Sequence, residues 1–397
     1  MLDSLTGGKK LTDLFQWDAV LHDNFLFKLH HQANFTVILF GVAFIFGMNY
    51  LDGAAIKCTK VADNDNQDFN EKYCWLHGSG HVPPALRPDS YAKGGLPCIA
   101  NPAEVTDAED ERHTHYYLWV PFVLLLCLAI IKAPRVLWKE VCERGMIAGA
   151  VRGEDLTTTT QPPEKIAEKY NKLRRKAGIF HLGFFICELL NIASVLLCFA
   201  ILDALFGKKY FKYGADFIAP SAVDPVDPLC NLFPSVVSCT VKTGGISGNA
   251  DISNHLCLLS NNLFNQYYFL ILWFWWVVLL AVSALGLVYR LAQMFLPAAS
   301  QWVFLRKLEP HGVQLSDWRP GKLEKFSSAD YFLLGRICQN LKGSQIVEVL
   351  KEVNKPGTSR TAEPRVVGIG RTEPRVEPEG NTEKHAMVPL TTTIDID

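Results

Sequence analysis

The sequence predicts an all-α membrane protein with four transmembrane helices, two disulfide-bonded extracellular loops and a helical cytoplasmic region. Apolar residues gather in four blocks, each long enough or nearly so to cross a bilayer core: residues 34–51, 116–131, 180–206 and 267–289. Most of the charge lies between these blocks, and six of the 11 cysteines lie in the two segments that follow the first and the third block. An apolar content of 49% would also fit a soluble domain, so the distribution of these residues decides the fold class.

The blocks divide the chain into segments, and each segment has a predicted character. In order, we expect a cytoplasmic N-terminal segment (1–32), a first span (33–51), a first extracellular loop (52–115), a second span (116–132), a cytoplasmic loop (133–179), a third span (180–206), a second extracellular loop (207–265), a fourth span (266–289), a cytoplasmic helical region (290–352) and a disordered tail (353–397). The tail is rich in Pro, Glu, Thr and Arg, a composition that cannot bury a core.

Charge predicts the orientation of the spans. Residues 132–178 contain 11 Lys or Arg, and such loops stay on the cytoplasmic side. Residues 52–114 contain 6 Lys or Arg against 11 Asp or Glu, so we expect this loop outside the cell. Because the number of spans is even, both termini are then cytoplasmic. The first 32 residues show no apolar core of the signal-peptide type, so the first span is expected to act as an uncleaved anchor.

Individual residues in and before the spans carry further expectations. The amphipathic N-terminal segment fits a short helix that either lies on the membrane surface or folds toward a pore. Gly41 and Gly47, in or beside the first span, allow another helix to approach closely. Glu188 in the third span is ionisable at membrane depth, where such groups usually face protein or water. For Glu188 we favour a hydrogen bond between helices over a role in gating or permeation.

The cysteines indicate a covalent framework outside the cell. Three lie in the first outside loop and three in the second: Cys58, Cys74, Cys98, Cys230, Cys239 and Cys257. An even number of cysteines in polar segments that meet an oxidising exterior is typical of disulfides. Six cysteines allow about 15 pairings, so their positions alone do not fix the connectivity. The other five cysteines are expected to be reduced thiols in the spans or the cytoplasm.

The sequence argues against several other functions. The net charge is −1 and no basic stripe is present, so we expect no nucleic-acid partner. No nucleophile with a base, carboxylate pair or phosphate-binding glycine loop stands out, so we expect no enzyme, catalytic residue or cofactor. Cys74, His77 and His81 resemble zinc ligands in spacing, but a disulfide uses the same cysteine, so no metal site is expected. Residues 109–111, which are acidic, lie near two histidines and are more typical of a solvated surface than of a calcium or proton sensor.

Several motifs, in this order and spacing, together resemble one known family. They are His22-Asp23-Asn24-Phe25, Tyr73-Cys74-Trp75, Tyr116-Tyr117-Leu118-Trp119-Val120, Pro134-Arg135-Val136-Leu137-Trp138, Phe233-Pro234, Cys239-Thr240 and Leu256-Cys257-Leu258-Leu259. The family is the innexins, and the resemblance covers roughly residues 20–350. The chain departs from the family at Leu118, where Gln is usual, and in having three rather than two cysteines in each outside loop.

The resemblance implies a subunit of a gap junction. Copies of the chain, alone or mixed with other innexins, would form a ring around a large pore for ions and small molecules, and the family implies an octamer. The ring would lie in the lipid bilayer of the plasma membrane at cell contacts and dock to a ring on the neighbouring cell. The same reading includes a non-junctional hemichannel. The alternative is a four-span adhesion or scaffold protein without a pore, which would have little use for ring assembly.

The resemblance also implies roles for particular residues. Family members join the two outside loops, which implies the pairs Cys58 with Cys257 and Cys74 with Cys239. Cys98 and Cys230 are extra and suggest a third bridge between the loops. By the family's orientation, Asp3 and Asp52 face the pore, where their charge would favour cations. Neither outside loop contains an Asn-x-Ser/Thr sequon, so no sugar is expected to block docking.

Overall fold

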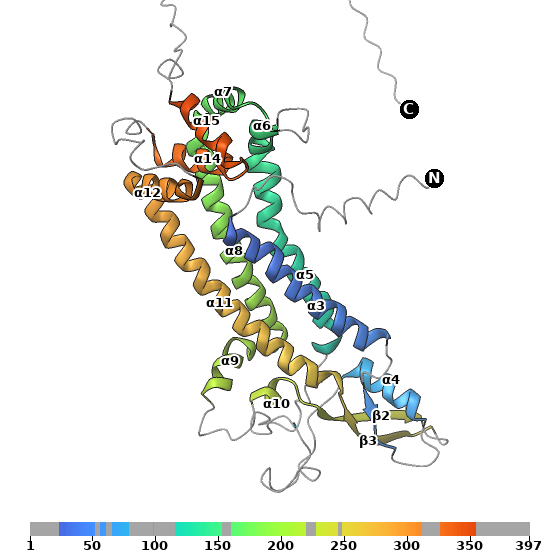
Figure 1. Ribbon diagram of the computed structural model, residues 1–397. Helices are drawn as coiled ribbons and strands as arrows, with labels where there is room; N and C mark the ends of the chain where they lie inside the picture. The colour runs from blue at the N-terminus through green and yellow to red at the C-terminus, as the bar shows by residue number, and fades with distance from the viewer. Residues whose placement is uncertain are drawn as a thin grey trace, which may run out of the picture. The chain divides into compact units, whose positions relative to one another are not determined.

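The computed structural model describes residues 24–51, 56–60, 66–78, 98, 116–152, 160–219, 228–244, 248–311 and 326–354. Within this part of the chain, four helices are long and apolar enough to cross a membrane: Phe25–Tyr50, Tyr116–Glu143, Ala177–Leu205 and Asn261–Phe295. The prediction of four spans is therefore confirmed. Figure 1 shows these helices side by side, with further helices at one end and a small sheet at the other.

Each long helix extends beyond the apolar block that predicts it. The first comprises α2 (Phe25–Lys28), a π-helical turn η1 (Leu29–Asn34), α3 (Phe35–Phe46) and a second π-helical turn η2 (Gly47–Leu51). The second comprises α5 (Tyr116–Leu137) and η6 (Trp138–Glu143), the third is α8 (Ala177–Leu205), and the fourth is α11 (Asn261–Phe295).

The first helix begins at Phe25, ahead of the predicted boundary at residue 33. The reason is a cap: the Oδ1 atom of Asn24 accepts a hydrogen bond from the backbone N–H of Phe27 at 2.7 Å. The polar residues that follow, including His30, His31 and Asn34, are buried against other helices rather than solvated. Apolar periodicity therefore underestimates the length of this helix.

The four long helices form one bundle with a continuous apolar core. α3 packs against α5 and α11, and α8 also packs against α5 and α11. Gly41 of α3 makes one of these contacts possible. A Cβ atom at position 41 would lie 2.1 Å from the ring of Tyr268 on α11, so only glycine permits this approach. The structure thus confirms the close helix contact predicted for Gly41. The same expectation for Gly47 is wrong, because no atom of the described residues lies within 4 Å of a Cβ placed there.

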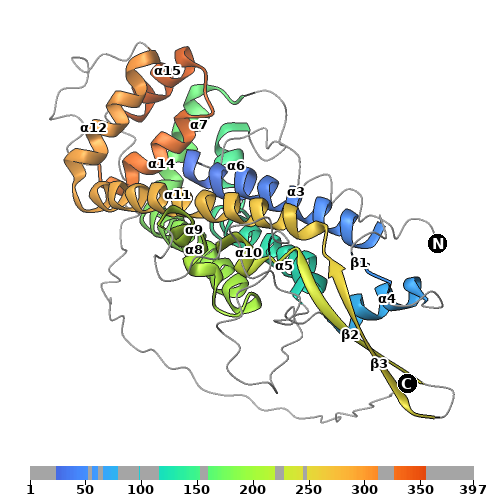
Figure 2. The ribbon, with the colours of Figure 1, turned by 90° about the horizontal axis from the view of Figure 1, so that it is seen from below.

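We call one end of the bundle the helical end, because a second core of helices lies there. It contains α6 (Met146–Arg152), α7 (Pro163–Arg174), α12 (Pro297–Leu308), the short 3₁₀ helix η7 (Glu309–His311), α14 (Ser328–Cys338) and α15 (Gly343–Val353). Buried side chains from η6 and from the start of α8 join this core, among them Trp138 and Phe184. Figures 1 and 2 show α7, α14 and α15 gathered together at this end. The described residues within 146–174 and 297–353 therefore form one unit.

The opposite end, which we call the sheet end, carries β1 (Lys57–Cys58), β2 (Val236–Gly244) and β3 (Ala250–Leu258). The strands are antiparallel in the order β1-β3-β2. Three helices lie at the same end: α4 (Gln67–His77), α9 (Tyr210–Ile218) and α10 (Pro228–Leu232). The chain is mostly helical, as predicted, but the sequence analysis did not predict this sheet. β1 joins it from a distant part of the sequence, and β2 and β3 form a hairpin within residues 207–265, which were expected to be a loop.

Candidate functional site

Three disulfides hold the sheet end together, and each joins one predicted outside loop to the other. Cys58 on β1 is bonded to Cys257, its neighbour in register on β3, with their Cα atoms 4.0 Å apart. Cys74 on α4 is bonded to Cys239 on β2, with a Cα–Cα distance of 5.8 Å. A third bond joins two further cysteines, Cys98 and Cys230. Two of these pairs are those that the family resemblance implies, and the third joins the two extra cysteines.

These disulfides build one compact body from two segments that are far apart in the sequence. The bonded cysteines are separated by 199, 165 and 132 residues. A bond that closes so long a loop typically stabilises the fold by about 2–4 kcal/mol. The sulfur atoms of Cys58, Cys74 and Cys257 lie within 4.8 Å of one another, but all three are in disulfides and offer no thiolate to a metal.

A chain of hydrogen bonds fixes this disulfide-bonded body to the bundle. The hydroxyl of Tyr117 on α5 donates to the carbonyl of Trp75 at 3.2 Å. The amide of Asn49 at the end of the first helix donates to the carbonyl of Tyr117 at 3.1 Å. Asn261 on α11 in turn donates to the side-chain oxygen of Asn49 at 2.8 Å. Asn49, Tyr117 and Asn261 are buried, so these hydrogen bonds are shielded from water and hold the sheet end in a fixed position relative to the long helices.

Several candidate residues lie outside the described part of the chain. They are Asp3, Asp52, His81, the acidic residues 109–111 and the histidines His113 and His115. The proposed pore-facing roles of Asp3 and Asp52 therefore remain predictions from the family resemblance.

Toward the helical end, a buried ion pair joins two of the long helices, and a hydrogen bond to the same carboxylate joins a third. The carboxylate of Glu188 on α8 accepts two hydrogen bonds from Arg290 on α11, from Nε at 2.9 Å and from Nη2 at 3.0 Å. It also accepts one from the amide of Asn24, at the start of the first helix, at 2.7 Å. Both charged side chains are 8% exposed. The structure shows the helix-to-helix hydrogen bond that we favoured for Glu188.

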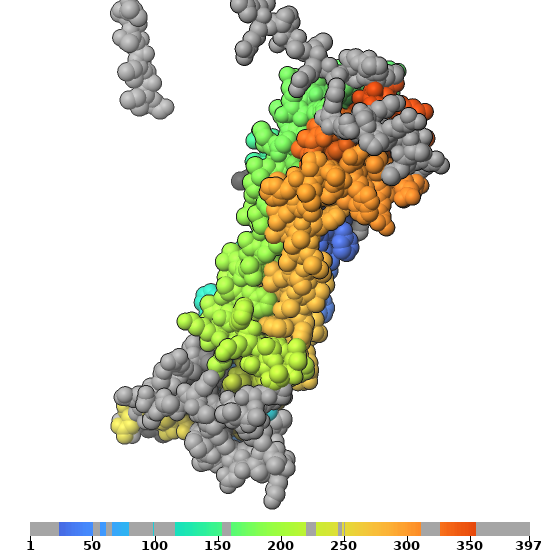
Figure 3. Space-filling view, turned by 90° about the vertical axis from the view of Figure 1, so that its left-hand side faces the viewer, coloured from blue at the N-terminus to red at the C-terminus, as the bar shows by residue number. Residues whose placement is uncertain are grey.

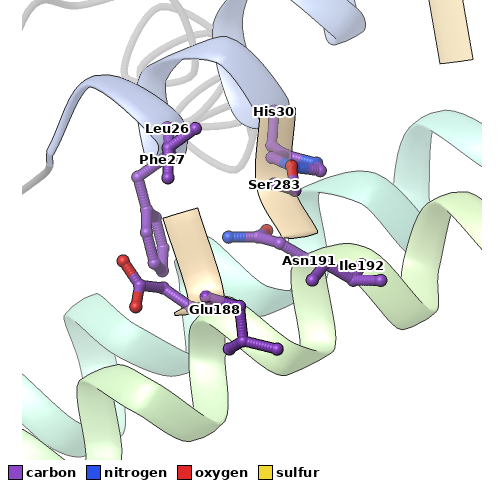
Figure 4. Close-up of a pocket in the computed structure, with 8 residues that line it drawn as sticks. Leu26, Phe27, His30, Glu188, Asn191, Ile192 and Ser283 are labelled. Atoms are coloured by element: carbon purple, nitrogen blue, oxygen red, sulfur yellow. The ribbon is translucent and has the colours of Figure 1, made fainter. Parts of the chain in front are cut away.

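A polar contact lies beside this ion pair, at the centre of the bundle. Figure 4 shows Glu188 and Asn191 projecting from one helix toward the helix that carries Phe27 and His30. The Nε2 atom of His30 lies 2.7 Å from the hydroxyl of Ser283, and these residues line a small cavity of about 10 Å³. Sequence reasoning assigned His30 to a segment before the first span and so missed it. Its signal was the polar run 30–34 directly before an apolar block.

The lateral surface of the bundle is apolar on all four long helices. Exposed side chains include Phe40, Phe44, Phe122, Leu126, Leu182, Leu190, Leu197, Ile271, Val278 and Leu285. Phe40 and Phe44 of α3 form one aromatic row with Phe264 of α11, with ring centroids 3.9–6.5 Å apart. Exposed apolar surface of this extent marks contact with a membrane or another protein.

Comparison with known proteins identifies similar chains. A family model described as Innexin matches residues 23–356. The chain is 30% identical to Innexin inx2 of Schistocerca americana over 355 residues, which cover 86% of this chain and 95% of the relative. It is 26% identical to Innexin inx3 of Drosophila melanogaster, with 91% of each chain covered. It is 28% identical to Innexin inx2 of Drosophila melanogaster, with 86% of this chain and 93% of the relative covered.

Proposed function

Because this chain belongs to the innexin family of gap-junction channel subunits, we propose that its disulfide-bonded sheet end docks a ring of subunits to a ring on a neighbouring cell. The observation that carries this proposal is the set of three disulfides between the two outside loops. They make one body from both loops at one end of a four-helix bundle. Such a body can meet its counterpart without first being ordered, which lowers the entropic cost of association.

The proposed orientation places the sheet end outside the cell and the helical end in the cytoplasm. Disulfides form and persist on the oxidising side of a membrane. The helical end carries the basic segment 132–178, which the positive-inside rule assigns to the cytoplasm. Both termini then face the cytoplasm, and the protein lies in the plasma membrane at cell junctions.

We propose a ring of identical subunits, eight by analogy with the family, or a mixed ring with other innexins. The apolar surface of the long helices supplies the contacts with lipid and with adjacent subunits. In this arrangement the first helix and the N-terminal segment face the pore, and Asp3 and Asp52 add negative charge that favours cations. Innexins are channel proteins, and we propose no enzymatic activity, cofactor or metal for this chain.

Single-particle images of the purified full-length chain test ring formation and docking. We expect rings with a central pore, together with pairs of rings joined through their sheet ends. A double variant, Cys58→Ser with Cys257→Ser, should reduce the paired rings, whereas Cys127→Ser, which changes a free thiol in the bundle, should not. Monomers, or closed rings without a pore, would contradict the channel proposal and favour an adhesion protein.

A further inference from the structure

A larger cavity, of about 570 Å³, lies at the helical end of the bundle. Side chains from α2, α8, α11, α12 and α14 line it, so it forms where the cytoplasmic helices pack on the long helices. Figure 3 shows α12 lying across the end of α11, with part of the first helix visible below it. The volume falls within the range of about 300–1,000 Å³ that is usual for small-molecule sites.

The cavity is positively charged. Four cationic side chains line it: Lys28, Arg290, Lys307 and Arg336. Among the described residues of its lining, none is Asp or Glu. Glu188 is paired with Arg290. Within the described part of the chain, no ion pair joins Lys28, Lys307 or Arg336 to a carboxylate. A positive potential concentrated in a concave site attracts anions.

The surroundings of Arg336 and Lys307 make a bound anion energetically favourable. Arg336 is 4% exposed, and its guanidinium carbon lies 5.0 Å from the ring centroid of Phe332. Burial, and then the charge of Arg290, lowers the pKa of Arg336 to about 9, although Glu188 acts in the opposite direction. Burial, with the charges of Arg336 and Arg290, also lowers the pKa of Lys307. Clustered like charges in a partly dry site are unfavourable unless a counter-charge is bound.

A histidine ring nitrogen in the same lining also lacks a hydrogen-bond partner among the described residues. The Nε2 atom of His181 is buried and makes no hydrogen bond to any described residue. The His181 ring stacks on Phe332 at a centroid distance of 4.5 Å, and the residue itself is 3% exposed. Because buried polar atoms are usually paired, an unpaired nitrogen in the lining of a cavity points to a ligand with hydrogen-bonding oxygens.

We propose that this cavity binds a multiply phosphorylated anion, either the headgroup of an inner-leaflet lipid or a soluble inositol phosphate. Phosphate oxygens accept hydrogen bonds from guanidinium and ammonium groups, and arginine in particular binds them with two parallel bonds. Exposed apolar side chains continue from the cavity along the long helices, including Phe25 and Leu285, and would contact acyl chains. The lipid source rests on the proposed orientation, in which the helical end faces the cytoplasmic leaflet.

Titration of the purified full-length chain with each of two probes, under the same conditions, tests this proposal. One probe is a short-chain phosphatidylinositol bisphosphate and the other is inositol trisphosphate. The double variant Lys28→Gln with Lys307→Gln removes two charges from the cavity; Lys28 is half-buried and the Lys307 side chain reaches solvent at the cavity rim, so neither change disturbs the apolar core. The matched control, Arg306→Gln with Lys351→Gln, removes two charges from exposed positions of α12 and α15 that do not line the cavity.

We expect at least one probe to bind the wild-type chain and to bind the cavity variant about tenfold more weakly, since each charge-assisted hydrogen bond contributes strongly. The matched control should bind as the wild type does. Tighter binding of the lipid probe identifies a lipid headgroup as the source, whereas equal binding of both probes identifies a soluble phosphate. The proposal is overturned if neither probe binds the wild type, if the cavity variant retains full affinity, or if the control loses as much as the cavity variant.

Discussion

The buried pair between Glu188 and Arg290 gives the sharpest prediction about how the bundle is held together. The substitution Glu188→Gln keeps the shape of the side chain but removes its charge, which leaves the guanidinium of Arg290 buried without a counter-charge. Arg336 lies close enough to interact with Arg290, so the remaining charges repel. Breaking a buried ion pair on one side typically costs about 3–5 kcal/mol.

For a chain of this size, that loss corresponds to a fall in apparent Tm of about 4–6 °C. The assay is thermal unfolding of the purified chain in detergent, followed by size-exclusion chromatography. The matched control is Asp68→Asn, which breaks the pair of Asp68 with Lys72; both side chains are exposed, at 77% and 73%. Exposed pairs contribute at most about 1 kcal/mol, so this variant should unfold with the wild type.

A second variant separates charge from packing. Glu188→Leu combined with Arg290→Leu removes both charges, so no uncompensated ion remains and the double variant should be more stable than Glu188→Gln. If Glu188→Gln unfolds at the wild-type temperature, the ion pair does not hold the helices together and the reasoning is wrong.

Three further predictions follow from local packing and cysteine chemistry. Gly41→Ala should lower the unfolding free energy by about 1–3 kcal/mol, because the new methyl group meets an aromatic ring of the fourth helix. Gly47→Ala, with open space around the new methyl group, should be neutral or slightly stabilising. Thermal unfolding of the two variants compares them. Cys74→Ser breaks a disulfide and should lower the unfolding free energy by about 2–5 kcal/mol, while Cys142→Ser should have a smaller effect; equal loss in both would refute a structural role for the bond. Burial raises the pKa of Cys338 to about 12, so its thiol stays protonated at pH 8. A maleimide should therefore react with the half-buried Cys142 before it reacts with Cys338, and mass spectrometry reports the order. Prompt labelling of Cys338 would contradict its burial.

The sequence predicts the spans better than it predicts where they begin and end. Long apolar runs identify a helix in lipid because backbone groups there must be paired within the helix. The ends depend on partners that are distant in sequence: Asn24 caps the first helix and reaches Glu188, which is 164 residues away. No local pattern contains that information, so the first helix begins eight residues before the predicted boundary at residue 33.

The same limit explains why the sheet was not predicted. β1 has only two residues, Lys57 and Cys58, and it pairs with Leu258 and Cys257 from the other outside loop. A two-residue strand leaves no periodic signal, and its partner on β3 lies far along the sequence. β2 and β3 form a local hairpin, which was missed because residues 207–265 were expected to be a loop. The six cysteines did indicate that the loops form a covalent framework, but counting could not choose among the possible pairings. The family resemblance named two of the three pairs in the structure, and the third joins the two cysteines that the family lacks.

The cationic cavity was also absent from the sequence-based expectations. Its charged lining comes from Lys28, Arg290, Lys307 and Arg336, which lie on four separate helices. In the sequence each of these residues reads as an ordinary charge at or near a helix end, and their convergence depends on tertiary packing. The basic residues of segment 132–178, by contrast, predicted an orientation but no site.

Electrical recording from paired cells that express this chain tests the central claim most directly, since the two membranes can be clamped separately and the current between them measured. The account predicts a junctional current in wild-type pairs and its loss when one cell of each pair expresses Cys58→Ser with Cys257→Ser, because docking needs an intact sheet end on both sides. Surface expression without current, in paired cells and in single cells alike, would contradict a channel and leave an adhesion protein in its place.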